Sequence, residues 1–196
     1  MAVALSGRGP ILYRSRRLGE GCHPFDCLKL RTMVWRPRAP GSGITVTDDR
    51  RVTAVGRILR ATRLDELPQL WQVVTGTMRL VGPRPEDPRY VDLDDPVHRE
   101  VFMARPGITG LAQLMHVDEA TRLDGSEPER HYRTVILPRK LAIDAAYLRA
   151  RSTRLDLWIL ASTPLALVGR HPMPPPGLLP PGLLPADPAP GQVVHP

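Results

Sequence analysis

Two adjacent carboxylates, Asp65 and Glu66, stand in the stretch RLDELPQLW of a 196-residue chain whose formal net charge is +7. An ionised carboxylate can attack phosphorus to form an acyl phosphate. It can also hold magnesium, which binds one or two carboxylates together with substrate phosphates. Two neighbouring acids would divide these tasks between them. On spacing alone, however, the favoured interpretation is a surface helix capped by one acid, with the other acid spare.

Basic side chains near the acid pair favour phosphate chemistry instead. Arg60 and Arg63 precede the pair, and Arg84 lies between two prolines in the stretch GPRP. The prolines restrict the backbone and therefore aim the Arg84 guanidinium. Because arginine binds phosphate oxygens bidentately, such an arginine near two carboxylates suggests a diphosphate site. For Arg84 taken alone, a salt bridge to a neighbouring helix is an equally good interpretation.

The acid pair is expected at the start of a helix. Asp65 is a natural N-cap, Pro68 falls in the first turn and Gly76 closes the helix as a C-cap. Free N–H groups and the partial positive charge of the helix end should then lower the pKa of Asp65 and keep it ionised. The residues expected to form the apolar stripe of this helix are Leu67, Leu70, Trp71 and Val74.

The remaining patterns predict an α+β fold that is mostly helical, with a short N-terminal β-hairpin. The hairpin strands are PILYRSRRLG and FDCLKLRTM, separated by the turn-like GEGCHP. A short strand is predicted in MRLVGPRPEDPRY, and RPGITG is predicted to be a loop. Helical patterns are expected from Asp48 to Leu59, in DPVHREVFMA, over residues 128–150 and in the apolar segment 155–168, LDLWILASTPLALV.

The C-terminal residues differ in composition from the rest. From His171 the chain reads HPMPPPGLLPPGLLPADPAPGQVVHP, with PGLLP occurring twice. We expect a disordered or polyproline-like tail over residues 171–196, which leaves residues 1–170 as one catalytic domain. The segment 155–168 is too short to span a bilayer and suits a core helix or an interfacial helix.

The basic charge indicates an anionic partner, which is nucleic acid, a phosphorylated substrate or an acidic membrane surface. A nucleic-acid-binding module is disfavoured because the sequence has no RNP-like aromatic pattern, helix-turn-helix spacing or zinc finger. Cys22 and Cys27 flank His23, but no second Cys/His cluster follows to complete a zinc site. Two reduced thiols in a cytoplasmic protein are the favoured interpretation.

Four stretches, taken in order, resemble the signatures of the bacterial sugar transferases, the monotopic polyprenyl-phosphate phosphoglycosyl transferases. They are KLRTM, GRILRATRLDELPQLWQVVTGTMRLVGPRP, RPGITGLAQL and LPRKLAIDAAYLRARSTRLDLWILASTP. The resemblance covers about residues 9–168, and several long motifs in the right order are more specific than any single motif.

This resemblance implies transfer of a sugar phosphate from a nucleotide-diphosphate sugar to a polyprenyl phosphate, with release of a nucleoside monophosphate. It implies a Mg²⁺ cofactor and a covalent phosphosugar–enzyme intermediate. Asp65 matches the family's nucleophile. Glu66 matches its partner in the dyad, for which we favour metal binding, shared with Asp65, or help with proton transfer. The product would initiate assembly of an exopolysaccharide, an O-antigen or another glycoconjugate.

The resemblance also extends to four basic residues. Arg60 and Arg84 match motif arginines that are expected to bind substrate phosphates. Lys29 and Arg31 of KLRTM match as well, and we place them with the phosphate-binding residues.

The family resemblance implies a place at the cytoplasmic face of the bacterial cell membrane, on an anionic surface. Relatives begin with an apolar segment that enters the membrane, whereas only MAVALSGR precedes GPILYR here. The alternative function is therefore a truncated, inactive remnant of such an enzyme. A second departure follows the GITG loop, where MHVDEATRLDG replaces the Asn-Gly-Arg-like stretch of many relatives.

Overall fold

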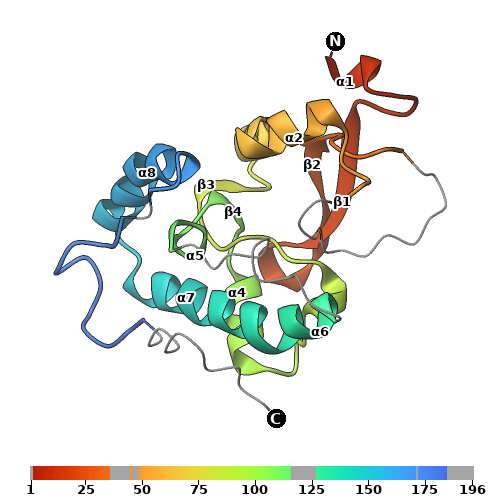
Figure 1. Cartoon of the computed structure of the whole chain (residues 1–196). Coiled ribbons are helices and arrows are strands. Elements are labelled where there is room, and N and C mark those ends of the chain that lie inside the picture. The colour runs from red at the N-terminus through yellow and green to blue at the C-terminus, as the bar shows by residue number, and fades with distance from the viewer. Residues whose placement is uncertain (1, 36–44, 46–48, 116–126, 171, 185–196) are drawn as a thin grey trace.

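A computed structural model describes residues 2–35, 45, 49–115, 127–170 and 172–184. The chain forms the predicted α+β fold, with an N-terminal hairpin, a small central sheet and helices around them (Figure 1). In Figure 1 the hairpin lies at the right, α7 (Leu137–Ala150) lies below the centre and α8 (Thr153–Leu167) lies at the left. Short helices α1 (Ala2–Leu5) and α2 (Ala54–Ala61) lie above the hairpin.

The hairpin confirms the sequence prediction. Strands β1 (Leu12–Leu18) and β2 (Pro24–Leu30) pair antiparallel, with Ser15 opposite Cys27. A 3₁₀ turn over Glu20–Cys22 joins them and contains Gly21 at φ +68°, a left-handed conformation that glycine adopts without steric cost. Because side chains alternate across a strand, one face of the hairpin is directed at the rest of the domain.

The central sheet has one strand that the sequence did not predict. Strand β3 (Arg79–Val81) pairs in parallel with β4 (Gly107–Thr109), which lies inside the stretch predicted to be a loop. A three-residue strand is too short to show an alternating pattern. Gly107 is required here because a Cβ atom would overlap the backbone nitrogen of Gly82. The GPRP and GITG loops therefore lie against each other.

Helices cover this sheet and enclose two apolar clusters. Asp95 caps α4 (Pro96–Met103) and Ser152 caps α8, each by accepting backbone N–H groups. The predicted helix over 128–150 is continuous but changes type, from α6 (Pro128–His131) through a π-helical turn (Tyr132–Ile136) to α7. One cluster packs α4 against α7, and the other packs α5 (Leu111–Leu114), α7 and α8.

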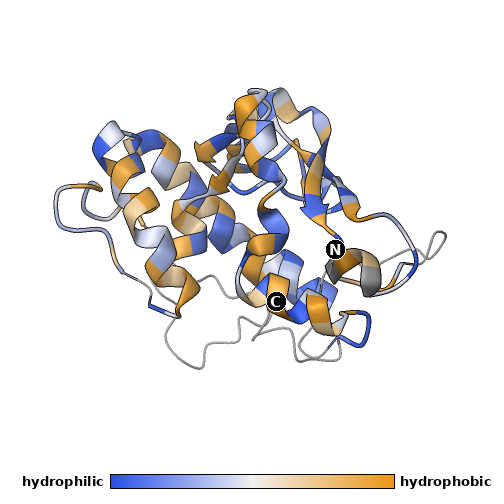
Figure 2. Cartoon of the chain, turned by 90° about the horizontal axis from the view of Figure 1, so that it is seen from above, coloured by the Kyte–Doolittle hydropathy of each residue, from blue (hydrophilic) through white to orange (hydrophobic). Residues whose placement is uncertain are grey.

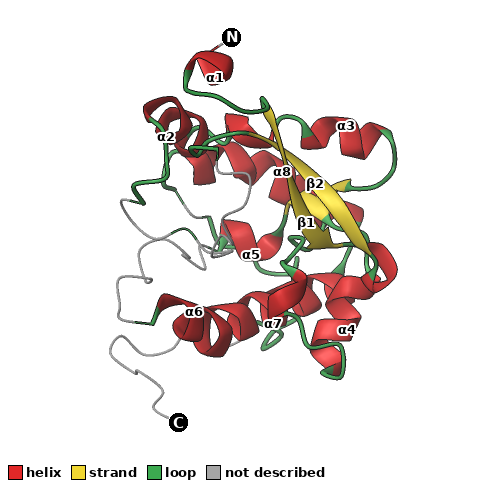
Figure 3. Cartoon of the chain, turned by 90° about the vertical axis from the view of Figure 1, so that its right-hand side faces the viewer, coloured by secondary structure: helices red, strands yellow, loops and turns green. Residues whose placement is uncertain are grey.

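The prediction for the helix after the acid pair was wrong in two respects. The helix α3 (Gln69–Val74) begins only at Gln69, and Asp65 lies before it in a 3₁₀ turn (Leu64–Glu66) without capping α3. The predicted apolar stripe faces outward, with Trp71 65% exposed, while Gln69 and Gln72 are buried. The Gln72 amide bonds the backbone of β2, accepting from the N–H of Leu28 and donating to the carbonyl of Asp26. Figure 3 shows α3 beside this strand.

The helix α2 shows a similar difference. Ile58, one of the apolar residues of the helical pattern expected from Asp48 to Leu59, is 66% exposed, while Gly56 packs inward against the carbonyl oxygen of Thr32. The helix α3 ends as predicted, with Gly76 at φ +79° directly after its C-cap, Thr75.

The C-terminal segment is described only up to residue 184. Residues 172–184 form turns at the two PGLLP repeats, and Leu178, Leu179 and Leu184 pack against the cluster around α8. Residues 185–196 of the predicted tail, and residues 116–126 in the segment after the GITG loop, lie outside the described residues. In the part of the chain that the structure describes, no helix is long and apolar enough to cross a membrane.

Candidate active site

Glu66 is held at the centre of a cationic cluster. Its Oε1 accepts hydrogen bonds from Lys29 Nζ at 2.9 Å and from Arg84 Nη2 at 2.8 Å, and Arg63 Nη1 lies 3.8 Å away. The carboxylate is 8% exposed. Burial by itself would raise the pKa of Glu66, but the charges and hydrogen bonds of Arg84 and Lys29 outweigh it and hold this pKa well below its usual range. Glu66 is therefore ionised throughout the neutral range.

Asp65 has a different environment from its neighbour. Asp65 is buried, 7% exposed, and among the described residues its carboxylate makes no hydrogen bond or ion pair. Burial raises its pKa, with Lys29 and Arg60 opposing this effect and the Glu66 charge adding to it. The expectation of a pKa lowered by a helix end was thus wrong, because Asp65 does not lie at the N-terminus of α3. Within the described part of the chain, the Asp65 carboxylate is thus buried without a hydrogen-bond or ion-pair partner.

A left-handed residue produces this arrangement of the two acids. Arg63 precedes the 3₁₀ turn and has φ 56°, a conformation that is costly for a residue with a side chain. The turn that follows directs both Asp65 and Glu66 inward. The same segment carries Leu64 and Leu67 on the outside, 43% and 51% exposed.

The structure brings three of the four predicted phosphate-binding residues to the acid pair. Lys29 and Arg84 contact Glu66 directly. Arg60 donates from Nε to Thr32 Oγ1 at 2.9 Å, and its charge acts on Asp65. The prediction for Arg31 was wrong, because this residue lies beyond the end of β2 and is turned away.

Arg31 has a structural role at the N-terminus. Its guanidinium is buried and donates to the carbonyl oxygens of Val3, Gly7 and Pro10, each at 2.8 Å. These contacts hold the segment before β1 against the hairpin. Lys29 and Arg31 share the KLRTM stretch, so the pattern gave no sign that one would face the site and the other would not.

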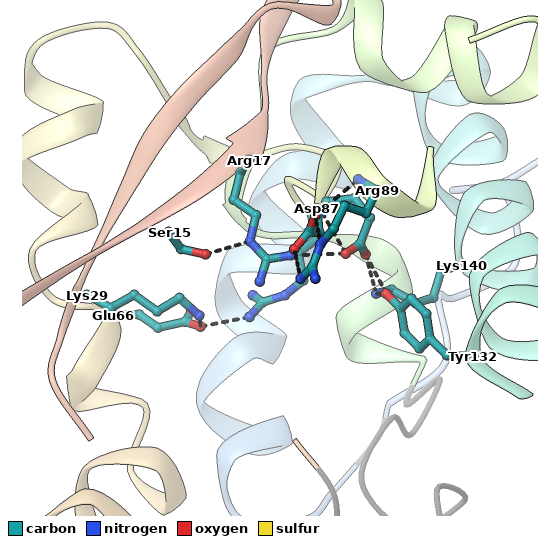
Figure 4. Close-up of polar contacts among 10 residues, drawn as sticks. Ser15, Arg17, Lys29, Glu66, Asp87, Arg89, Tyr132 and Lys140 are labelled. Atoms are coloured by element: carbon teal, nitrogen blue, oxygen red, sulfur yellow. Dashed lines mark hydrogen bonds and ion pairs between the residues drawn. The ribbon is translucent and has the colours of Figure 1, made fainter. Parts of the chain in front are cut away.

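Sequence reasoning missed a further buried carboxylate, Glu86, two residues after Arg84. Glu86 accepts from Arg17 Nη1 at 3.0 Å, Tyr132 OH at 2.5 Å and Lys140 Nζ at 3.2 Å (Figure 4). Its partners come from β1, the π-helical turn and α7. The available signal was the GPRPE stretch itself, because its glutamate follows closely on a fixed arginine and could be expected to pair with cationic side chains.

The helix α7 also holds the backbone of Arg84. Asp144 lies one turn after Lys140 on α7, is fully buried and accepts the backbone N–H groups of Arg84 and Ala112. Burial raises the pKa of Asp144 to about 7, with Lys140 opposing this effect. One helix therefore fixes both the GPRP loop and the start of α5.

An apolar pocket opens beside the acid pair. Its volume is about 180 Å³, and Glu66 and Arg63 contribute polar groups to its wall. Thr109 and Thr163 are hydrogen-bonded to each other at 2.9 Å in this wall. The other lining residues are mostly apolar and come from the acid-pair segment, β4, α5 and α8: Leu67, Leu70, Ile108, Gln113, Leu114, Ala166 and Leu167.

The acid pair fits the ligand set of magnesium. Lys29 and Arg84 use only Oε1 of Glu66, which leaves its Oε2 and the Asp65 carboxylate as oxygen donors. Within the described residues, no group of three or more His, Cys, Asp or Glu side chains is arranged to hold a metal ion. Two carboxylate donors suit a magnesium ion that takes its remaining ligands from substrate phosphates and water.

Comparison with known proteins identifies the family of this chain. The family model described as "Bacterial sugar transferase" matches residues 1–170. The chain belongs to the bacterial sugar transferase family. It is 41% identical over 167 residues to a UDP-glucose:undecaprenyl-phosphate glucose-1-phosphate transferase of Caulobacter vibrioides, covering 83% of this chain and 58% of that relative.

Other members of the bacterial sugar transferase family match shorter parts of their own length. An undecaprenyl-phosphate glucose phosphotransferase of Komagataeibacter xylinus is 36% identical over 170 residues, covering 83% of this chain and 30% of that relative. An Aeromonas hydrophila protein named UDP-N-acetylgalactosamine-undecaprenyl-phosphate N-acetylgalactosaminephosphotransferase is 38% identical over 117 residues, covering 58% of this chain and 28% of that relative. This chain thus spans between about a quarter and three fifths of these relatives.

Proposed function

We propose that this chain transfers a sugar 1-phosphate from a nucleotide-diphosphate sugar to undecaprenyl phosphate, through a covalent intermediate on Asp65. The observation that supports this most strongly is the contrast within the acid pair. Glu66 is bound by Lys29 and Arg84, whereas the neighbouring Asp65 carboxylate has no hydrogen-bond or ion-pair partner among the described residues. The relatives' names supply the substrate classes, since they include a UDP-sugar and undecaprenyl phosphate.

The reaction proceeds in two displacements at phosphorus. In the first, an Asp65 oxygen bonds to the phosphorus that carries the sugar, and the bond to the bridging oxygen of the diphosphate breaks. The nucleoside monophosphate leaves with that oxygen and its electron pair. In the second, an oxygen of undecaprenyl phosphate attacks the same phosphorus and the Asp65 carboxylate leaves. Basic side chains at Lys29, Arg60 and Arg84 stabilise the negative charge on the phosphate oxygens.

Burial raises the pKa of Asp65, while the charges of Lys29 and Arg60 favour the ionised form that can attack phosphorus. Because no described residue holds Asp65 in an ion pair, its oxygens remain available to the phosphorus of a substrate. Magnesium, held by Asp65 and by Oε2 of Glu66 together with the diphosphate, would neutralise phosphate charge when bound. Glu66 itself stays ionised and keeps Lys29 and Arg84 in place.

The outward face of α3 suits the lipid acceptor. Leu67, Leu70, Trp71 and Val74 form an apolar surface that lies directly beside the acid pair. Near the C-terminal end of α8, Leu165, Leu167 and Val168 are also exposed. Hydrophobic segments alternate with hydrophilic ones along the helices at the left of Figure 2, where α8 lies. We propose that this face rests on the cytoplasmic surface of the membrane.

The apolar pocket would then receive the first part of the isoprenoid chain. Its wall runs from Leu67 and Leu70 to Ala166 and Leu167, and Glu66 and Arg63 mark its polar side. A phosphorylated lipid that enters from the membrane would place its apolar chain among the leucines and its phosphate near the cations.

Intact-protein mass spectrometry tests the proposed function. Incubation with UDP-glucose or UDP-N-acetylgalactosamine, in the absence of lipid, should add one sugar phosphate to the chain. Asp65→Asn keeps the shape of the side chain and removes the nucleophile, so this variant should remain unmodified while folding normally. An adduct that persists in Asp65→Asn would contradict the assignment. No adduct and no nucleoside monophosphate release with any sugar nucleotide would favour an inactive remnant.

A further inference from the structure

One face of the hairpin contributes more side chains to the surroundings of the acid pair than the sequence indicated. Ser15 pairs with Cys27 across the hairpin, and Arg17 and Lys29 lie two residues from them on the two strands. Because side chains two apart share a face of a sheet, these four side chains lie on one face of the hairpin, with Arg17 and Lys29 on opposite sides of the Ser15–Cys27 pair. The charges that act on the buried Cys27 thiol include those of Lys29, Arg84 and Arg17, so all three cations lie around it.

Arg17 is fixed in this face by two hydrogen bonds. Its Nε donates to Ser15 Oγ and its Nη1 donates to Glu86 Oε1, each at 3.0 Å. Figure 4 shows the Arg17 side chain reaching from β1 between these partners, on the same side of the hairpin as Lys29 and Glu66. Among the described residues, its second amino group, Nη2, has no hydrogen-bond partner. The side chain is 20% exposed.

Glu86 is itself held from the opposite side. Tyr132 and Lys140 contact its Oε2, and the Glu86 and Lys140 side chains are each 7% exposed. Its Oε1 also accepts the backbone N–H of Asp87. The Glu86 carboxylate therefore cannot move toward Arg17 or away from it without losing several buried contacts. The guanidinium of Arg17 is correspondingly fixed in place.

The charges around the GPRPE stretch do not balance. Glu66 is shared by Lys29 and Arg84, and Glu86 is shared by Arg17 and Lys140. Asp65 and the buried Asp144 add two carboxylates, and Arg60 and Arg63 add two cations beside Asp65 and Glu66. Six cations thus face four carboxylates. An excess of cations on one side of a protein attracts a multivalent anion.

We propose that Arg17 binds a phosphate group of the donor diphosphate, beside Lys29 and Arg84, and that Glu86, Tyr132 and Lys140 position its guanidinium for this contact. The identity of the ligand rests on the proposed function. The contact uses the Nη2 group of Arg17, and the planar guanidinium suits phosphate oxygens better than an ammonium does. Arg17 is then a binding residue, and Lys140 and Tyr132 are positioning residues that touch no substrate.

Inorganic pyrophosphate is the simplest probe of this contact. Binding is measured by titration calorimetry in magnesium-containing buffer, with the 196-residue chain and three variants. Arg17→Ala should weaken binding about tenfold, the change that one charge-assisted hydrogen bond produces. The matched control is Arg16→Ala, because Arg16 is the next residue on β1, is 60% exposed and pairs at 3.4 Å with Asp26 on the other face. This control should bind pyrophosphate like the parent.

The Arg17→Ala fold should survive, since Glu86 keeps Tyr132, Lys140 and the backbone N–H of Asp87. If it does not fold, Arg17→Lys decides, because one ammonium cannot serve Glu86 and a phosphate together and binding should still weaken. Unchanged binding in the folded variant, or no pyrophosphate binding by the parent, would overturn the inference. Steady-state kinetics should show a raised KM for the sugar nucleotide in Arg17→Ala with kcat changed less.

The two proposals fail separately. A chain that binds pyrophosphate through Arg17 but forms no adduct with a sugar nucleotide refutes the proposed function and leaves the anion site standing. A chain that transfers sugar phosphate with the same KM in Arg17→Ala and Arg16→Ala refutes the role of Arg17 alone.

Discussion

Replacing Glu66 by glutamine should destabilise the fold by about 2 kcal/mol. Glutamine keeps the shape of the side chain but removes the negative charge that Lys29 and Arg84 share at 2.9 and 2.8 Å. Breaking a fully buried ion pair costs about 3–5 kcal/mol. The two cations retain side-chain exposures of 22% and 21%, so water relieves part of this cost and the lower figure applies.

Thermal unfolding at neutral pH and low salt measures this loss. For a chain of this size, the melting temperature should fall by roughly 4–8 °C. The matched control is Asp26→Asn, since Asp26 also faces two arginines, at 3.4 and 4.0 Å, but its side chain is 44% exposed. That pair should contribute no more than about 0.5 kcal/mol. Equal melting temperatures for Glu66→Gln and the parent, or an equal loss in Asp26→Asn, would refute the reasoning.

The pH dependence gives a second check on Glu66. Its pKa is lower in the folded chain than in the unfolded chain, so the stability that it contributes is fully present above the ordinary carboxyl pKa of 4.5. This contribution is lost as the pH falls through the folded pKa. The difference between the parent and Glu66→Gln should therefore be constant near pH 7 and narrow in strongly acidic solution. A difference that widened on acidification would contradict the assigned sign.

Two further predictions concern the metal and the membrane. Chelation of magnesium should abolish sugar-phosphate transfer, and Glu66→Gln should raise the magnesium concentration needed or eliminate turnover; full activity in excess chelator would argue against a metal-dependent reaction. The chain should bind anionic liposomes reversibly, and Trp71→Glu should weaken sedimentation with them, because Trp71 is 65% exposed on the apolar face of α3. The control is Met103→Glu on α4, where Met103 is 56% exposed, and this variant should bind liposomes as the parent does. High salt should release much of the bound protein from the liposomes, for the parent and for the control variant.

Local patterns were sufficient to predict the elements with a clear period or cap. The hairpin, α4 and the long helical segment over 128–150 follow from alternation, from an Asp-Pro start and from helical spacing. Strand β4 was missed because its existence depends on contact with β3, which lies more than twenty residues earlier, and on a backbone approach that only glycine allows. The π-helical turn that carries Tyr132 likewise has no periodic signature.

The site could be predicted only as far as its contiguous stretch. Asp65, Glu66 and Arg84 lie close in sequence, and Lys29 entered through the family resemblance. The partners of Glu86 lie 69 residues before it and 46 and 54 residues after it, so no spacing rule connects them. For Arg31 the error was to include a residue that lies outside the site. Arg31 shares a motif with Lys29, but it follows the end of β2 and donates to backbone carbonyl oxygens instead.

The orientation of α3 explains how one short segment can place carboxylates in the interior and apolar side chains on the surface. A helical stripe tells which residues lie on a common face, but the partners available in the fold decide whether that face is buried. Here Gln72 satisfies the backbone of β2, so the polar face packs inward and Leu67, Leu70 and Trp71 are directed to the outside. The turn before α3 sends Asp65 and Glu66 inward, to the cations of the hairpin and of the GPRP loop. Carboxylates and an apolar surface thus lie within one turn of each other, which is the arrangement that the proposed transfer from a water-soluble donor to a lipid acceptor requires.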